Sequence, residues 1–195
     1  MSRTTTVLAI AALAAASRTA PAQMRAGGGR PYSPADVHFM TGMIPHHAQA
    51  VLMAGWAATH GASPAVRALC ERIVVAQTDE IAFMQRWLRE RGEAVPDGGA
   101  GHAHAGPLMP GVLTAEQLAE LDRARQAEFD RLFLTFMIQH HEGAITMVET
   151  LFGSHGAAQD EDIFKFAVDV NADQTSEIDR MHSMLAAQSS GGKSS

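Results

Sequence analysis

The chain has 195 residues and a formal net charge of −6, with 15 lysine and arginine residues against 21 acidic ones. No basic run is long enough to follow a phosphate backbone, so a nucleic-acid partner is not expected. A single cysteine, Cys70, excludes a disulfide within the chain, whereas eleven methionines and ten histidines stand beside one tyrosine.

The first 22 residues have the three parts of a secretory signal peptide. Arg3 precedes an apolar run from Val7 to Ala16, and Ala20-Pro21-Ala22 supplies small residues for cleavage after Ala22. The apolar run is too short to span a bilayer, so an uncleaved membrane anchor is the weaker alternative. We therefore expect a periplasmic or secreted protein with a flexible, glycine-rich leader over residues 23–32 and no membrane span once the signal is removed.

Four main helices are predicted after the leader. Ser33-Pro34 and Ser63-Pro64 each combine an N-cap serine with a proline at the first helical position, and Thr114-x-x-Gln117 forms a capping box. The pattern predicts helices over about 33–60, 63–91, 115–152 and 160–187. The third of these helices either continues through Arg125 or is interrupted near it. No stretch alternates apolar and polar residues, so the prediction is an all-α four-helix bundle made of two repeated helical hairpins.

The predicted bundle is one domain over residues 33–188. It comprises a first repeat over 33–92, a crossover linker over 93–113 and a second repeat over 114–188. Residues 189–195 are predicted to form a disordered tail.

The division into repeats rests on a block that occurs twice, ninety-four positions apart. Met43-Ile44-Pro45-His46-His47 returns as Met137-Ile138-Gln139-His140-His141, and Gln77-x-x-Glu80-Ile81-x-x-Met84 returns as Gln174-x-x-Glu177-Ile178-x-x-Met181. Chance rarely repeats so much, which indicates two homologous halves. The match around the first block extends to Asp36, Phe39, Thr41, Ala50 and Met53, which recur as Asp130, Phe133, Thr135, Ala144 and Met147.

Each copy of the block places sulfur and imidazole on one face of a helix, because successive residues advance by about 100°. On the partner helices, Glu80 and Glu177 fall in otherwise apolar stripes. A buried carboxylate needs a partner, so we expect each to bond a histidine across the bundle, directly or through a shared metal. The candidate metal ligands are Met43, His46, His47, Met53, Met84, Met137, His140, His141, Met147 and Met181, supported by Glu80 and Glu177.

A simpler interpretation of these residues is packing. Methionine at helical spacing is usually core filler, and a lone buried histidine is usually hydrogen-bonded. Two adjacent imidazoles within a turn of thioethers, present twice, favour a metal site instead. Thioether with imidazole and no thiolate suits copper, Cu(I) above all. The linker residues His102, His104 and Met109 form either a weaker, mobile site or an ordinary solvated segment.

The two Met-Ile-x-His-His blocks, the Met109-Pro110-Gly111-x-Leu113-Thr114 segment and Glu128-Phe129-Asp130-x-x-Phe133-Leu134 resemble domain-of-unknown-function family 305. The resemblance covers most of the chain from Asp36 to Leu185, with one departure between the copies, Gln139 in place of Pro45. It implies a ferritin-like bundle in a family that includes CopM-type periplasmic copper-binding proteins. It also implies copper binding for sequestration, delivery or resistance, with Met43, His46, His47, Met137, His140 and His141 at the matched positions.

The expected function is therefore copper binding without catalysis, and the expected partners are the ion and a periplasmic copper donor or acceptor protein. The alternative is a structural or interaction bundle in which histidines bond the glutamates and no metal binds. A di-iron enzyme is disfavoured because no Glu-x-x-His pair is present, and a haem bundle is disfavoured because Cys-x-x-Cys-His is absent. The sequence leaves open whether the copies form one shared site or two, and which histidine of each pair is a ligand.

Overall fold

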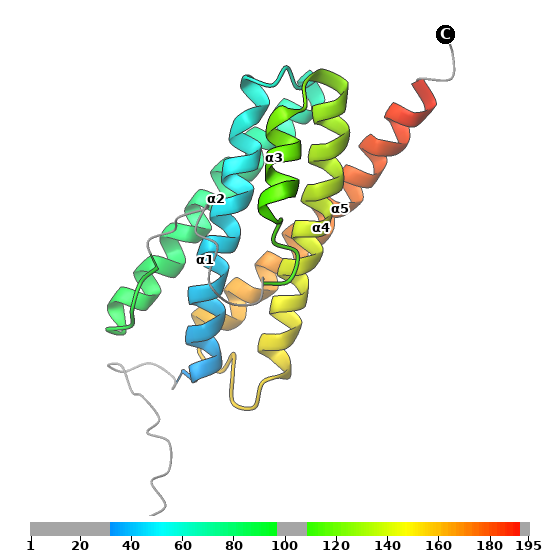
Figure 1. Cartoon of the computed structure of the whole chain (residues 1–195). Helices are drawn as coiled ribbons and strands as arrows, with labels where there is room; N and C mark the ends of the chain where they lie inside the picture. The colour runs from blue at the N-terminus through cyan, green and yellow to red at the C-terminus, as the bar shows by residue number, and fades with distance from the viewer. Residues whose placement is uncertain (1–31, 97–108, 192–195) are drawn as a thin grey trace, which may run out of the picture.

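The structure is a computed structural model of the chain and describes residues 32–96 and 109–191. The predicted signal peptide and nearly all of the leader lie outside the described residues, as do linker residues 97–108 with His102 and His104. The predicted all-α bundle is confirmed, and no strand occurs in the described ranges (Figure 1). The helices are α1 (Pro34–Gly55), α2 (Pro64–Glu90), α3 (Ala115–Arg123), α4 (Gln126–Gly153) and α5 (Glu161–Gly191).

Three of the predicted helix starts are confirmed by their caps. The side chains of Ser33, Ser63 and Thr114 accept hydrogen bonds from the backbone N–H three residues later, and both Ser33 and Thr114 form capping boxes. The first helix ends earlier than predicted, at Gly55. A 3₁₀ turn over Trp56–Ala58 follows it, because the last turn of a helix often tightens in this way.

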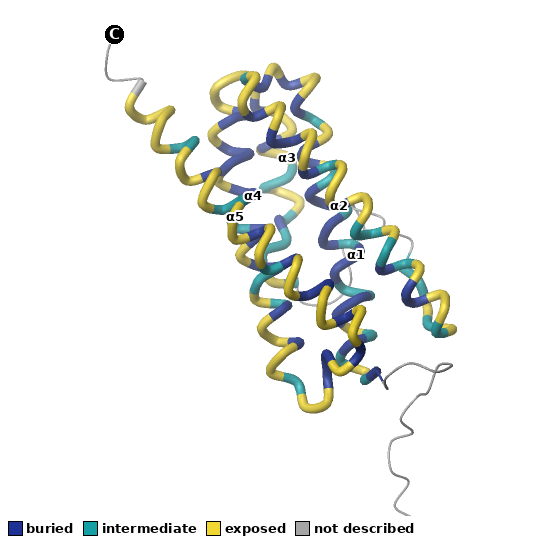
Figure 2. The backbone as a smooth tube through the Cα atoms, turned by 180° about the vertical axis from the view of Figure 1, so that it is seen from behind, coloured by how far each residue is buried: buried dark blue, intermediate teal, exposed yellow. Residues whose placement is uncertain are grey.

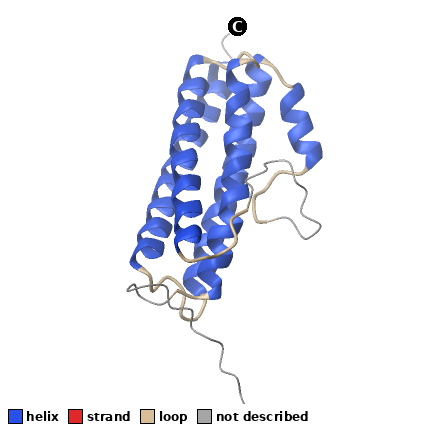
Figure 3. Ribbon diagram, turned by 90° about the vertical axis from the view of Figure 1, so that its left-hand side faces the viewer, coloured by secondary structure: helices blue, strands red, loops and turns tan. Residues whose placement is uncertain are grey.

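The predicted break near Arg125 separates α3 from α4. Arg125 is extended and Gln126 has a φ of 55°, so the chain turns sharply before α4 begins. The backbone N–H of Gln126 donates to the carbonyl of His60, 2.8 Å away, which ties this turn to the corner between α1 and α2. The short α3 consequently stands outside the group of four long helices (Figure 3).

The last helix is longer than predicted. α5 continues to Gly191, so the prediction of a disordered tail is wrong for its first three residues. The hydroxyls of Ser189 and Ser190 donate to the carbonyls of Leu185 and Ala186, at 3.1 and 3.0 Å, and so satisfy backbone groups near the exposed helix end (Figure 2).

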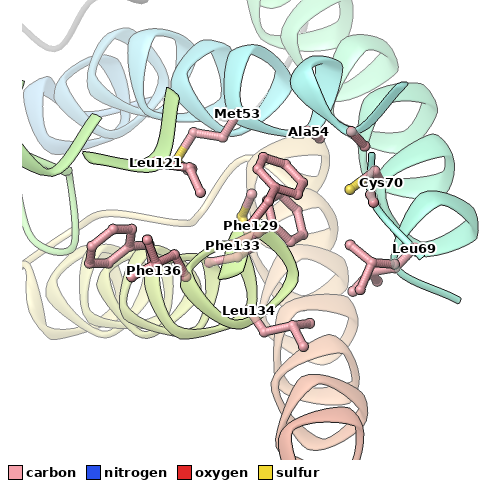
Figure 4. Packing of buried hydrophobic residues seen from close by; sticks show 14 of the residues in the cluster. Met53, Ala54, Leu69, Cys70, Leu121, Phe129, Phe133, Leu134 and Phe136 are labelled. Atoms are coloured by element: carbon pink, nitrogen blue, oxygen red, sulfur yellow. The ribbon is translucent and has the colours of Figure 1, made fainter. Parts of the chain in front are cut away.

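The four long helices form two hairpins, α1 with α2 and α4 with α5, which meet mainly through α1 and α4. Two apolar clusters fill the interior. One lies toward the α1–α2 corner, where Phe129 and Phe133 pack near Leu69 and Cys70 (Figure 4). The other lies toward the α4–α5 loop and is built around residues such as Trp87. None of the described helices is both long and apolar enough to cross a membrane.

Cys70 is buried and is not paired in a disulfide. Burial, followed by the negative charge of Asp130, raises the pKa of its thiol to about 12. The thiolate form that binds soft metals is therefore not populated near neutral pH.

Two repeated aspartates join the hairpins to each other. Asp36 Oδ1 accepts a hydrogen bond from the backbone N–H of Ala158, before α5, at 2.7 Å. Asp130 Oδ1 accepts from the backbone N–H of Ser63, before α2, at 3.1 Å. Each aspartate of one half therefore holds the loop that begins the second helix of the other half.

Replacing Asp36 by alanine is expected to lower the free energy of unfolding by about 3 kcal/mol, because the buried N–H of Ala158 and the partly buried N–H of Ser33 lose their acceptor. This corresponds to a fall in melting temperature of roughly 6–12 °C for a chain of this size. Asp79→Ala, at an exposed position of α2, is the matched control and should change the melting temperature little. Equal thermal unfolding of the two variants would show that the Asp36 contacts do not hold the hairpins together.

Candidate metal centre

A layer of polar side chains crosses the bundle between the two apolar clusters, halfway along the long helices. The histidines come from α1 and α4, and all four are fully buried. The amides and carboxylates come from α2 and α5. We call the set the polar layer: His46, His47, Gln77, Glu80, His140, His141, Gln174 and Glu177.

His46 and His140 form the centre of the polar layer. Their ring centroids lie 3.9 Å apart with the ring planes at 43°, so the two imidazoles are in contact across the interface between α1 and α4. His47 lies 6.2 Å from His46 and His141 lies 6.3 Å from His140, both measured between ring centroids and both at 57°. The two repeats thus place their histidine pairs in nearly the same geometry.

Each outer histidine faces a glutamate of the partner helix. His47 Nε2 lies 2.8 Å from Glu80 Oε2, although without the alignment of a hydrogen bond, and His141 Nε2 donates to Glu177 Oε2 at 2.7 Å. Each glutamate therefore lies against a histidine, through a hydrogen bond for Glu177 and at ion-pair distance for Glu80. The carboxylates are not in the core, however: the Glu80 and Glu177 side chains are 19% and 22% exposed and lie at the edge of the layer.

Most of the other ring nitrogens have no protein partner. All four Nδ1 atoms, and Nε2 of His140, are buried without a hydrogen bond in the part of the chain that the structure describes. His46 Nε2 donates to the carbonyl of Pro110 at 3.1 Å. A carbonyl or carboxylate oxygen can only accept from a neutral ring's N–H, so a neutral His46 or His141 keeps its lone pair on Nδ1. Such lone pairs are what a metal ion binds.

The central histidines are held neutral. Burial, followed by the neighbouring His47, lowers the pKa of His46 to about 3. Burial, followed by the neighbouring His46 and the outer histidines, lowers the pKa of His140 well below its usual value. Neutral imidazole is the form that ligates metal, so protons do not compete for these two rings near neutral pH.

The depressed pKa values predict that the metal-free protein loses stability in mild acid. The unfolded chain binds a proton at each histidine below about pH 6.5, whereas folded His46 and His140 do not, so stability is fully present above that pH. Each histidine contributes a fall of about 1.4 kcal/mol per pH unit below that pH, and for His46 the fall continues until the pH reaches about 3. Urea unfolding between about pH 7 and pH 5 measures this slope. A flat profile would contradict burial of the neutral rings.

The predicted methionine ligands flank the polar layer in the two apolar clusters. In the described residues, no three or more histidine, cysteine, aspartate or glutamate side chains lie close enough to hold a metal ion together. A metal site at this layer would therefore combine no more than two such side chains with the flanking thioethers. Met43, Met84 and Met147 lie in the cluster toward the α4–α5 loop, and Met53, Met137 and Met181 in the other, with only Met147 partly exposed.

The segment Met109–Leu113 crosses α1 and α4 beside the histidines, and we call it the strap. The Gln49 side chain bonds both the N–H and the carbonyl of Leu113, at 2.8 and 3.2 Å. Gln139 Nε2 donates to the carbonyl of Gly111 at 3.3 Å. Gly111 has a φ of 76° and lies directly on the α4 backbone beside Gly143.

Sequence reasoning missed Gln49, Gln139, Gly143 and the carbonyl of Pro110 as parts of this site. A signal was present, because Gln49 and Gly143 are equivalent positions of the two repeats, as are Pro45 and Gln139, and both pairs differ in residue type. The strap contacts positions at which the repeats have diverged.

The chain matches one family model, described as domain of unknown function (DUF305), over residues 36–185. Similar solved structures include a DUF305 fragment from Deinococcus radiodurans, 24% identical, which covers 81% of this chain and 99% of the fragment with a TM-score of 0.68. A DUF305 protein from Streptomyces coelicolor, described as a candidate secreted protein, is also 24% identical and covers 80% and 94% with the same TM-score. At these identities the likeness concerns the fold.

CopM is similar to this chain in both of two copper-bound forms. It is 27% identical, with 78% of this chain and 96% of CopM covered, and the TM-scores are 0.64 for the Cu(II)-bound form and 0.61 for the Cu(I)-bound form. A curated relative, the uncharacterized protein L153 of Acanthamoeba polyphaga mimivirus, is 36% identical over 56 residues, which are 29% of this chain. The match spans 37% of that relative's length.

Proposed function

The chain belongs to the DUF305 family, and from this premise we propose that it binds copper ions, Cu(I) above all, at the polar layer and its flanking methionines. The ion is cargo: the protein holds it or passes it on and catalyses no reaction. The observation that carries the proposal is the set of buried ring nitrogens without hydrogen-bond partners. In the copper-bound protein, lone pairs of those nitrogens would coordinate the ion.

A purely structural bundle does not account for these nitrogens. Leaving a buried polar atom without a partner costs about 1–3 kcal/mol, so a cluster of such ring nitrogens favours a role in binding a ligand over packing alone. Packing alone would select leucine or alanine at these positions, whereas a ligand-binding role explains why imidazole is kept.

The donor set favours copper among the common metals. Neutral imidazole suits copper in both oxidation states, and thioether sulfur suits Cu(I). The methionines Met43, Met84, Met137 and Met181 are fully buried beside the layer, so a reduced ion there would be shielded from water. The CopM structures with Cu(II) and Cu(I) bound support the same choice of metal for a related fold.

The proposed setting is outside the cytoplasm. A signal peptide is predicted over residues 1–22, and a structural neighbour is described as a candidate secreted protein. In that setting the role would be sequestration, resistance or delivery of copper, with a periplasmic donor or acceptor protein as the partner. Ligand exchange between thioethers and imidazoles would let the ion leave without any covalent step.

A metal titration of the mature chain, residues 23–195, tests the proposal. Cu(I) should be bound in competition with an affinity-setting chelator, and more tightly than Zn²⁺ or Fe²⁺ run in parallel. A stoichiometry of one ion would indicate that the repeats share a site, and two ions would indicate separate half-sites. Failure to compete for Cu(I) at all would overturn the proposal in favour of a metal-free interaction bundle.

A further inference from the structure

A cavity of about 250 Å³ lies between α2 and α5, on the side of the bundle away from the strap. The proposed copper ligands do not line this cavity, because the histidines lie deeper in the bundle, on α1 and α4. Its walls come only from these two helices, and they include four of the eight polar-layer residues: Gln77, Glu80, Gln174 and Glu177.

The two glutamates connect this cavity to the buried histidines. Glu80 and Glu177 line the cavity and are about one-fifth exposed, while one oxygen of each lies within 2.8 Å of a fully buried imidazole nitrogen. A cation in the cavity would therefore be one carboxylate away from His47 or His141.

The cavity also holds two buried amides without partners. Gln77 and Gln174 are 3% and 2% exposed, and Oε1 of each has no hydrogen bond among the described residues. An amide oxygen can accept only from a donor or a cation. Two such oxygens at equivalent positions of the repeats indicate that the cavity takes a ligand that is positively charged or carries donor hydrogens, such as a hydrated ion.

The charge of the cavity fits a cation. Asp173 joins the two glutamates in the lining, and burial, followed by the charges of Glu80 and Glu177, raises the pKa of its carboxyl group. Arg72 and Arg180 also belong to the lining and moderate this charge. Since no three such side chains of the described chain can jointly coordinate an ion, the cavity would attract a hydrated cation without retaining it.

The opposite approach to the histidines is closed. The strap lies across α1 and α4, with the Pro110 carbonyl on His46 and Gly111 in contact with the α4 backbone. There is no room there even for the methyl group of an alanine at position 111 or 143. The route to the polar layer therefore runs from the α2–α5 side.

We propose that the α2–α5 cavity is the port through which a copper ion reaches and leaves the histidines, with Gln77, Gln174, Glu80 and Glu177 lining its path. This inference rests on the proposed copper binding and adds the path of the ion. A port differs from a binding site in a measurable way: obstructing it slows uptake and release by the same factor and leaves the equilibrium affinity unchanged.

Ser176→Trp tests the port, because Ser176 lines the cavity mouth, is exposed and contacts no histidine. Stopped-flow copper loading, and removal by excess chelator, should both slow by about tenfold, while Kd stays within about twofold of the parent. Thr175→Trp, one residue away on α5 and outside the lining, is the matched control and should load and release at the parent rates.

A second variant tests the charge of the port. Asp173→Lys should lower the association rate constant by about tenfold at low salt and reduce its dependence on ionic strength. Unchanged rates in both Ser176→Trp and Asp173→Lys, with copper still bound, would overturn the port and leave copper binding intact. A weaker Kd in Ser176→Trp at unchanged association rate would also overturn it, by making the cavity a binding site. A parent protein that binds no copper would overturn the proposed function and the port together.

Discussion

Gly143→Ala is expected to lower the free energy of unfolding by about 3 kcal/mol, or roughly 6–12 °C in melting temperature, although alanine favours the helix over glycine. A Cβ at this position of α4 would collide with the carbonyl group of Pro110 and with Gly111 Cα. These are backbone atoms of the strap, which Gln49 and Gln139 hold in place by hydrogen bonds. No side-chain rotation can relieve the collision, so the strap or the helix must move.

Gly55→Ala is the matched control, since it is also a helical glycine but has no atom within 4 Å of the added Cβ. It should leave the melting temperature unchanged or raise it, because alanine in place of glycine adds up to about 1 kcal/mol to the free energy of unfolding. Thermal unfolding by circular dichroism compares the two variants with the parent. Equal melting temperatures of Gly143→Ala and Gly55→Ala would contradict the close packing of the strap on α4.

His140→Leu is expected to stabilise the metal-free protein by about 1–3 kcal/mol and to weaken copper binding by about 100-fold or more. Both ring nitrogens of His140 are buried without partners, and the ring is fully enclosed. Leucine has a similar volume and no polar atom, so it removes a desolvation cost from the folded state while removing a ligand. Opposite changes in stability and affinity are the signature of a site kept for function.

The measurements for His140→Leu are a chelator competition with Cu(I) and urea unfolding of the metal-free protein. His182→Leu, at an exposed position of α5, should change neither quantity appreciably. His140→Leu should also reduce the loss of stability in mild acid, because it removes one neutral buried imidazole. A destabilised His140→Leu that binds copper as tightly as the parent would remove His140 from the site.

The parts of the molecule that could be predicted from sequence are those that the two repeats share. The repeated histidines lie together in the core, and the repeated glutamates face them, because equivalent residues of equivalent hairpins occupy equivalent places. Helix starts were predictable from serine, proline and threonine caps, which act within one turn of the chain. Whether the histidines and methionines ligate copper stays a prediction, since it depends on the ion itself.

The features that could not be predicted are of two kinds. Some turn on which of two neighbouring residues is buried, and others, such as the strap, occur only once and have no counterpart in the other repeat. On α2 the apolar Ala76 is exposed, whereas the polar Gln77 beside it is buried. Neighbouring positions on a helix point in directions about 100° apart. Periodicity over a short window therefore does not decide which of two neighbouring residues faces the core. The strap is a loop that contacts distant helices, and its hydrogen bonds to Gln49 and Gln139 have no local pattern.

The crossed contacts of Asp36 and Asp130 have a consequence for ancestry. Each hairpin holds a loop of the other through one aspartate, and a twofold axis in a homodimer of identical hairpins would give the same exchange of contacts. A homodimer could not have glutamine in one copy and glycine in the other at the same position. A single chain can, and at the equivalent positions Gln49 and Gly143 the two halves contact the strap in different ways.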